Sequence, residues 1–437
     1  MRRWRRSPER CLETEVSADR GWRRWGRNLR RIGPGLITGA SDDDPSGIGT
    51  YAQAGAAYGY STLWTALFLL PIMIAIQGTC ARIGLVTGQG LAGVLRRHYP
   101  PWLLYAAVLA LCVANTINIG ADLGAIAAGI GLLTGWHTRW LILPIALIIV
   151  VLLVLGSYRL IANVFKWLTL SLLAYVVTPF LVSVDWGAVL RATLLPTFRL
   201  DRDFMTMMVA IWGTTITPYC FFWQADMVVE ELHADGRWPE ESAPAVSCTD
   251  LRGAHLDTNI GMAYSNLVTF FIILTTGATL HVAGVTDIQS AQQAATALRP
   301  LAGDLAYGLF ATGLIGTGML AIPVMAGSSA YALCATRDWP AGLNLVWHEG
   351  VQFYLVVIAG IGVGVGLDFL GVNPIKALVW AAVINGLTAP LLMVLILMIA
   401  NSSRVMGEFR NEPWTNAVGW LGTIAMGLVA VLSLVLI

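Results

Sequence analysis

Charged residues are scarce in this chain. Asp, Glu, Lys and Arg make up only 12% of its 437 residues, whereas soluble domains carry about 25%. Hydrophobic residues reach 56%, and many apolar stretches are as long as the roughly 20 residues that cross a bilayer. This balance excludes an ordinary soluble domain and predicts an all-α polytopic membrane protein in contact with the lipid bilayer.

Cysteine and histidine are also few, and neither forms a recognisable metal-binding pattern. The six cysteines include no CxxC pair, so buried free thiols are favoured over disulfides or a zinc site. The six histidines include no HExxH motif, and no P-loop or Ser/His/Asp arrangement is visible. The glycine-rich run 360–366 lies in an apolar stretch, where close helix packing explains it. The sequence therefore predicts neither an enzyme nor a resident cofactor.

The first 32 residues lack the long apolar run of a secretory signal peptide. Arginine recurs through this segment instead. A basic tail is compatible with nucleic-acid binding, but the positive-inside rule favours a cytoplasmic tail at 1–32 ahead of a transmembrane domain at 33–437. We therefore expect a multi-pass protein of the plasma (inner) membrane with a cytoplasmic N-terminus and no nucleic-acid partner.

About eleven membrane spans are predicted from the apolar stretches. They cover residues 33–57, 62–86, 102–132, 140–156, 160–184, 204–231, 258–281, 305–332, 351–371, 375–400 and 415–437. The most polar connection is 232–257, and a solvated loop or a short amphipathic element on the cytoplasmic face explains its composition.

The first and the sixth span each contain a helix break. The run 41–47 places three aspartates, a proline and a glycine inside an apolar stretch, and the run 214–219 places a proline among threonines. Such breaks free backbone carbonyls that can bind cations, and ionisable groups within a membrane mark ion pathways. Breaks at corresponding places favour two inverted repeats, at 33–184 and 204–400, with an extra helix at 415–437.

Asp44 is the first candidate ligand for a cation. It directly precedes Pro45, where the helix must open, and the carbonyl near Ser41 faces the same gap. Carboxylate, carbonyl and hydroxyl oxygens suit a hard cation. An alternative is that these acidic residues cap the second half of the helix. Asp42 and Asp43 better fit the role of caps or entrance residues, and Asp44 better fits that of ligand.

The second break offers Thr214, Thr217 and Tyr219, followed by Gln224 on the second half of the helix. Threonine hydroxyls in membrane helices commonly bond back to their own backbone. The facing break in the first span is what favours coordination by these residues.

A polar stripe runs through the third span. Asn115, Asn118 and Asp122 lie on one helical face. Such a stripe is typical of a water-lined proton or ion route. Hydrogen bonding between helices explains the asparagines equally well and stays an alternative.

Three motifs together resemble the Nramp family of divalent metal transporters. The longest, DPSGIGTYAQAGAAYGYSTLW at 44–64, is similar to the DPGN-IATDLQAGAxxGYxLLW region of that family. GTTITPY at 213–219 stands where the family has GATxMPH, and ADLGA at 121–125 resembles TDLAE. The resemblance implies the LeuT-type fold of two inverted five-helix repeats, with the metal as transported substrate.

The same alignment shows where this chain departs from the family. The coordinating aspartate is kept as Asp44, but the family's asparagine and methionine ligands become Gly47 and Thr217. Loss of the soft thioether favours hard ions such as magnesium or manganese. The family's histidine becomes Tyr219, and the acidic residue after Asp122 becomes Ala125, which predicts weak or absent proton coupling.

These inferences define a candidate site and a function. The predicted metal ligands are Asp44, Ser41, Gly47, Thr214 and Thr217, with Asp43, Asp122, Tyr219 and Gln224 in supporting or coupling positions. The predicted function is secondary transport of a divalent cation by alternating access. Alternatives are a LeuT-fold carrier of a small organic or anionic solute, and a membrane sensor with a vestigial metal site. The sequence does not determine the oligomeric state.

Overall fold

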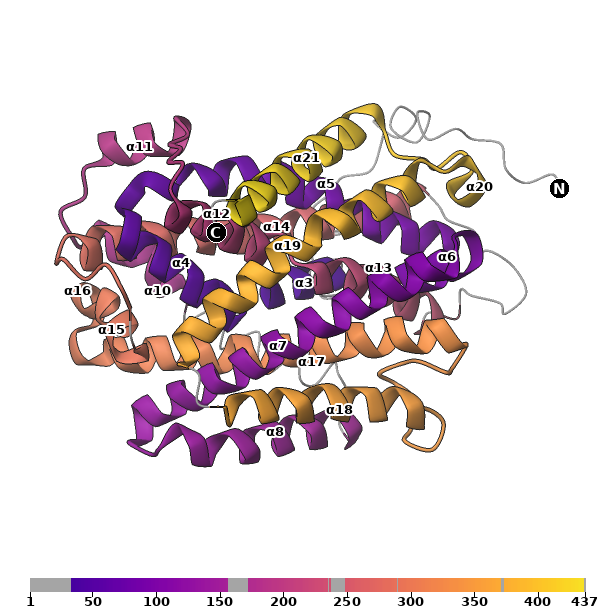
Figure 1. The fold of residues 1–437 in the computed structure, drawn as a ribbon, viewed down its shortest axis with the longest axis horizontal. Coiled ribbons are helices and arrows are strands. Elements are labelled where there is room, and N and C mark those ends of the chain that lie inside the picture. The colour runs from indigo at the N-terminus through magenta and orange to yellow at the C-terminus, as the bar shows by residue number, and fades with distance from the viewer. Residues whose placement is uncertain are drawn as a thin grey trace, which may run out of the picture.

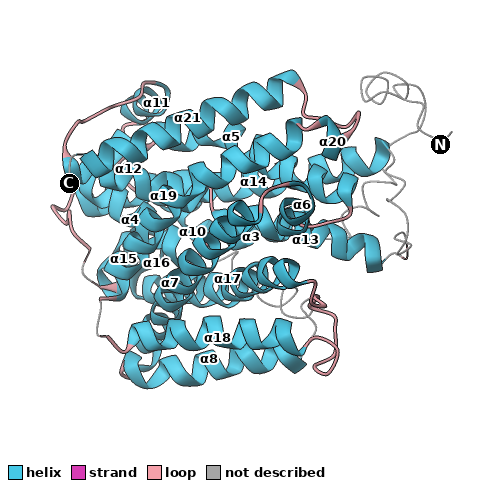
Figure 2. Ribbon diagram, turned by 45° about the vertical axis from the view of Figure 1, so that its right-hand side comes forward, coloured by secondary structure: helices cyan, strands magenta, loops and turns pink. Residues whose placement is uncertain are grey.

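The described part of the chain is all-helical. The computed structural model describes residues 33–155, 172–234, 236, 248–288, 290–370 and 373–435, and no strand occurs within these ranges (Figures 1 and 2). The N-terminal tail at 1–32 and the first part of the predicted fifth span, at 160–171, lie outside the described residues.

The long unbroken helices agree with the predicted spans. They are α5 (Trp64–Thr87), α7 (Pro101–Thr134), α8 (Thr138–Leu155), α14 (Cys248–Thr276), α17 (Ala306–Arg337), α18 (Val351–Asp368), α19 (Pro374–Asn401) and α21 (Pro413–Val435). Among the described residues, nine segments are long and apolar enough to cross a membrane, one of them the broken pair at Arg202–Ala234. The total of eleven stays a prediction, as do the boundaries of the repeats.

Short helices connect the long ones. They are α6 (Leu91–His98), α10 (Leu173–Val177), α11 (Trp186–Leu194), α15 (Ala291–Ala295), α16 (Arg299–Ala302), α20 (Ser403–Met406), the 3-10 turns η1 (Gly59–Thr62), η3 (Thr178–Phe180), η5 (Thr296–Leu298) and η6 (Gly303–Leu305), and the π-helical turn η4 (Gly277–His281).

Both predicted helix breaks are present. The first separates α3 (Pro34–Asp42) from α4 (Pro45–Tyr58), and the second separates α12 (Arg202–Thr215) from α13 (Pro218–Ala234). A proline opens each second half, because its missing N–H and fixed φ suit the first helical position and not the interior. Proline alone does not make a break, since Pro71, Pro144, Pro323 and Pro390 lie inside continuous helices. At both breaks the proline stands directly beside polar residues, the aspartates before Pro45 and the threonines before Pro218.

The predicted connection at 232–257 is wrong for its last ten residues. These form the start of α14, which begins at Cys248. The reason is tertiary: Asp257 caps α3, with Oδ2 accepting from the Gly35 N–H at 2.6 Å and Oδ1 from the Leu36 N–H at 3.2 Å. A carboxylate here satisfies backbone donors that have no partner within their own helix. Polarity in the sequence thus marks a helix cap here and not a loop.

The broken helices lie inside the bundle and other helices cover them. Of an apolar 18-residue stretch within Arg202–Ala234, 94% is buried, against 33% of the corresponding 18-residue stretch in each of α8, α18 and α21. In both ribbon views α8 and α18 lie side by side along one edge, α21 lies toward the opposite side, and α3 lies between them (Figures 1 and 2). The exposed leucines and valines of the outer helices are suited to lipid, which is as apolar as they are.

Glycines allow α3 and α14 to touch backbone to backbone. A Cβ on Gly39 would lie 2.2 Å from the Gly261 carbonyl oxygen, and a Cβ on Gly261 would lie 2.1 Å from the Gly35 carbonyl oxygen. Neither position has room for a side chain. This close approach holds α3, and with it the first helix break, against α14.

We predict that Gly39→Ala destabilises the protein, because the methyl group meets backbone that cannot move aside. The expected loss is about 1–3 kcal/mol or more, measured as a lower unfolding temperature of the purified protein in detergent. Gly360→Ala on α18 is the matched control, since a Cβ there meets nothing within 4 Å. It should be neutral or stabilising by up to about 1 kcal/mol. Equal unfolding temperatures for the two variants would contradict the packing argument.

Candidate functional site

Asp44 lies at the centre of the first break and is completely buried. Its Oδ1 accepts from the Gly47 N–H and from the Ser46 hydroxyl, both at 2.7 Å. Its Oδ2 accepts from Asn118 Nδ2 at 2.8 Å and from the Tyr219 hydroxyl at 3.4 Å. Helices α4, α7 and α13 therefore all supply neutral donors to one carboxylate.

The predicted division of labour among the three aspartates is wrong in one respect. Asp44 itself is the N-cap of α4, because it is extended and directly precedes Pro45 at the first helical position. Asp42 is the last residue of α3, and Asp43 follows it. Neither of these two caps α4. Asp44 therefore both caps α4 and lies at the centre of the site.

Asp42 and Asp43 form a second polar cluster beside the first. Asp42 Oδ1 accepts from the Thr217 hydroxyl at 2.7 Å and from the Cys220 thiol at 3.6 Å. The Ser265 hydroxyl on α14 lies 3.1 Å from Asp42 Oδ2 and 3.1 Å from Asp43 Oδ1. Asp43 Oδ2 is buried without a hydrogen-bond partner in the described structure. Thr217, a predicted metal ligand, thus lies against Asp42.

The two breaks are joined by hydrogen bonds. The Tyr219 hydroxyl donates to the Ser41 carbonyl at 2.9 Å, so the carbonyl freed by the first break is occupied by the second. The Thr214 hydroxyl lies 3.2 Å from the Ser46 hydroxyl. Gln224 lies elsewhere, with its Oε1 accepting from Thr38 at 2.7 Å. Gln224 therefore makes its hydrogen bond to α3 and to none of the aspartates.

Asp122 lies close to Asp44 and to the Ser46 backbone. It is completely buried, and neither carboxylate oxygen has a hydrogen-bond partner among the described residues. It follows Asn118 by one helical turn, so the polar face predicted for the third span points into the site. Asn115 instead donates from Nδ2 to the Met325 carbonyl at 3.0 Å, which confirms interhelical hydrogen bonding for that residue.

Four residues that touch the aspartates were absent from the predicted set: Ser46, Asn118, Cys220 and Ser265. Asn118 was visible as part of the polar stripe, and Ser46 follows the Asp44-Pro45 step directly. Both could have been included on those signals. Ser265 gave no signal, because a lone serine in an apolar span usually bonds to its own helix. Only the packing of α14 against α3 brings it to the aspartates.

The site concentrates carboxyl groups without a basic partner. Asp42, Asp43, Asp44 and Asp122 are all buried, and none of them makes an ion pair within the described ranges. The described residues also contain no cluster of three or more His, Cys, Asp or Glu side chains arranged to hold a metal. Burying an unpaired charge costs several kcal/mol. The arrangement therefore favours cations or protons that enter from outside, with neutral oxygens completing the ligand set.

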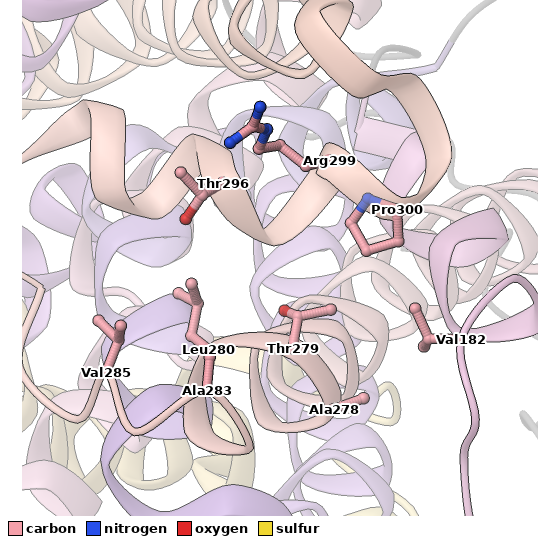
Figure 3. A pocket seen from close by; sticks show the side chains of 9 residues that line it. All are labelled: Val182, Ala278, Thr279, Leu280, Ala283, Val285, Thr296, Arg299 and Pro300. Carbon is pink, nitrogen blue, oxygen red and sulfur yellow. The ribbon is translucent and has the colours of Figure 1, made fainter.

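One surface pocket of about 570 Å³ lies apart from this site. Figure 3 shows its lining, which includes Leu280, Val285 and Arg299. None of its lining residues belongs to either helix break. It is not the place where the aspartates converge.

Solved structures of membrane transporters share this arrangement of two broken helices inside a helical bundle. The manganese transporter of Eremococcus coleocola, in complex with an aromatic bis-isothiourea compound, matches with a TM-score of 0.74 at 18% identity, covering 96% of this chain and 89% of that one. Mhp1, a nucleobase-cation-symport-1 family transporter, matches with a TM-score of 0.59 at 16% identity, covering 93% and 91%. This is the LeuT-like fold that the family resemblance implied.

Sequence comparison then identifies the family. The profile of the natural resistance-associated macrophage protein-like family, Nramp, matches residues 35–436. A divalent metal cation transporter MntH of Verminephrobacter eiseniae is 27% identical over 406 residues, covering 90% of this chain and 86% of that protein. An MntH of Granulibacter bethesdensis is 25% identical over 421 residues, covering 95% and 89%. The chain belongs to the Nramp family, and these relatives are transporters and not enzymes.

We predict that Thr217→Val lowers stability, because it removes the hydroxyl that donates to buried Asp42 while keeping the side-chain shape. Loss of one donor to a buried carboxylate should cost about 1–3 kcal/mol, measured by thermal unfolding in detergent. Thr423→Val on α21 is the control, since that buried hydroxyl bonds to the Gly419 carbonyl of its own helix. A Thr217→Val protein as stable as wild type would show that this bond contributes nothing.

Proposed function

We propose that this protein carries divalent metal cations across the plasma (inner) membrane, with Asp44 as the central anionic ligand. The observation that carries the proposal is the position of Asp44, buried where both broken helices meet and surrounded by neutral donors. A carboxylate in that place, with the Ser41 carbonyl and the Thr214 hydroxyl nearby, offers the oxygen ligands that magnesium and manganese prefer. The names of the related transporters agree with a metal substrate.

Transport in this proposal proceeds by alternating access. Asp44, Asn118 and Tyr219 are each fully inaccessible to solvent, so an ion bound among them cannot leave in either direction without a rearrangement. The hydrogen bonds from Tyr219 to Ser41 and Asp44 tie the two breaks together. Opening to one side requires one half of a broken helix to separate from its partners.

The carboxyl groups of the site also argue against an anionic solute as the substrate. Four buried carboxylates without a basic partner in the described structure would repel an anionic solute. A small organic cation and a non-transporting sensor are not excluded by charge, and uptake measurements separate both from metal transport. Orientation follows the basic N-terminal tail, which places the N-terminus in the cytoplasm.

We predict that Asp44→Asn reduces uptake of Mn²⁺ or Mg²⁺ into proteoliposomes by at least about 30-fold, since losing a buried charged partner costs ~2–5 kcal/mol. Asp338→Asn is the control. Asp338 lies outside the spans, where hydrogen bonding from Arg96 lowers the pKa of its carboxyl, and its loss should leave uptake unchanged. Wild-type uptake by Asp44→Asn at equal reconstitution would refute the central role of Asp44.

Proton coupling is predicted to be weak or absent. A phenol at Tyr219 does not titrate near neutral pH as an imidazole does, and Ala125 offers no carboxylate beside Asp122. Vesicles loaded with a pH indicator should therefore show little internal acidification while the metal enters down its gradient. Metal-dependent acidification that disappears in Asp122→Asn would overturn this prediction and make Asp122 a proton acceptor.

A further inference from the structure

A methionine thioether lies beside the site on a helix that carries none of the predicted ligands. Met325, on α17, is completely buried. Asn118 Nδ2 donates to Met325 Sδ at 3.0 Å and to Asp44 Oδ2 at 2.8 Å. Both distances are measured from the same nitrogen, Asn118 Nδ2. The Met325 sulfur and the Asp44 Oδ2 therefore cannot be farther apart than these two distances added together.

The amide of Asn118 has an unused acceptor. Its Oδ1 is buried and has no hydrogen-bond partner among the described residues, although buried polar atoms normally have one. Rotating the Asn118 side-chain amide by about 180° around its Cβ–Cγ bond exchanges the positions of Oδ1 and Nδ2. The carbonyl oxygen then faces the space between Asp44 and Met325, where the amide nitrogen now stands.

We propose that Asp44, Asn118 and Met325 together form a cation-binding position between α4, α7 and α17, in which the Met325 thioether is the soft ligand. The proposal rests on the proposed transport of divalent cations and names further ligands of that site. It explains how the chain can keep a sulfur ligand although Thr217 lies against Asp42 and Gly47 has no side chain.

Met325 is held firmly enough to act as a ligand. Its backbone carbonyl accepts from Asn115 Nδ2 at 3.0 Å, and the same nitrogen donates to Ser328 and Ser329. Asn115 and Asn118 belong to α7, so both asparagines tie that helix to α17 around Met325. Two of the three proposed ligands thus come from unbroken helices, and only Asp44 comes from a break.

The thioether changes the expected selectivity. Soft sulfur ligands favour softer cations such as Cd²⁺ over Mg²⁺, which prefers oxygen. An ion bound to Asp44 and Asn118 alone would have only hard ligands. Met325 should therefore contribute to the affinity for Cd²⁺, less for Mn²⁺, and very little for Mg²⁺.

The test combines binding and X-ray absorption on the full-length protein in detergent. Cadmium added below one equivalent should show a sulfur neighbour in wild type, and that neighbour should disappear in Met325→Leu. Titration calorimetry should show that Met325→Leu weakens Cd²⁺ binding by about 10-fold or more, with Mg²⁺ binding changed less than about twofold. Met319→Leu is the matched control, because Met319 is buried on the same helix and should behave as wild type.

The remaining variants separate the sources of sulfur and keep the test decisive. Cys220 is a second sulfur near the aspartates. A sulfur neighbour of cadmium that disappears in Cys220→Ser but persists in Met325→Leu would overturn the proposal. Wild-type spectra with only oxygen neighbours would overturn it even if Met325→Leu does not fold. Binding of Mg²⁺ or Mn²⁺ without Cd²⁺ would refute the role of Met325 alone, whereas no binding of any of the three would refute the proposed function as well.

Discussion

The structure depends on one constraint: acidic side chains are buried at a helix break, with no basic side chain paired to them in the described residues. Asp42, Asp43 and Asp44 would be prohibitively costly in an apolar bundle without donors. The chain supplies hydroxyls from Thr217, Ser265 and Ser46, an amide from Asn118 and the Gly47 N–H. Each of these donors is neutral, so none of them balances the charge of an ionised carboxylate, and Asp43 Oδ2 has no hydrogen-bond partner among the described residues. That remaining charge makes the site receptive to cations.

The break serves structure and function with the same atoms. Asp44 caps α4, as an aspartate before Pro45 should, and the opened backbone exposes the Ser41 carbonyl. Tyr219 then occupies that carbonyl and approaches Asp44, so the second break closes the first. Binding of an ion would compete with these internal bonds, and this competition links occupancy of the site to the arrangement of the four half-helices.

The first half of the broken helix, α3, packs tightly against α14. Gly39 and Gly261 bring α3 and α14 into backbone contact, and Asp257 holds the start of α3 through two backbone N–H groups. The outer helices α8, α18 and α21 present apolar side chains outward. Buried carboxyl groups are therefore concentrated where the breaks meet, although other buried polar side chains, such as Gln77 and Asn385, lie elsewhere in the interior.

The sequence by itself determined the helical membrane class, the positions of both breaks and the family, and it singled out Asp44 as a candidate, because hydropathy and the residues beside a proline act locally along the chain. Only the tertiary structure decided which side chains meet at the site and hydrogen-bond to one another. In the folded protein Thr217 hydrogen-bonds to Asp42, and Gln224 hydrogen-bonds to Thr38. Ser265 on α14 contacts the aspartates, and Met325 lies beside Asn118. Periodicity shows which face of a helix is polar, but it does not show which distant helix meets that face, since hydrogen-bond partners more than a hundred residues apart are chosen by packing.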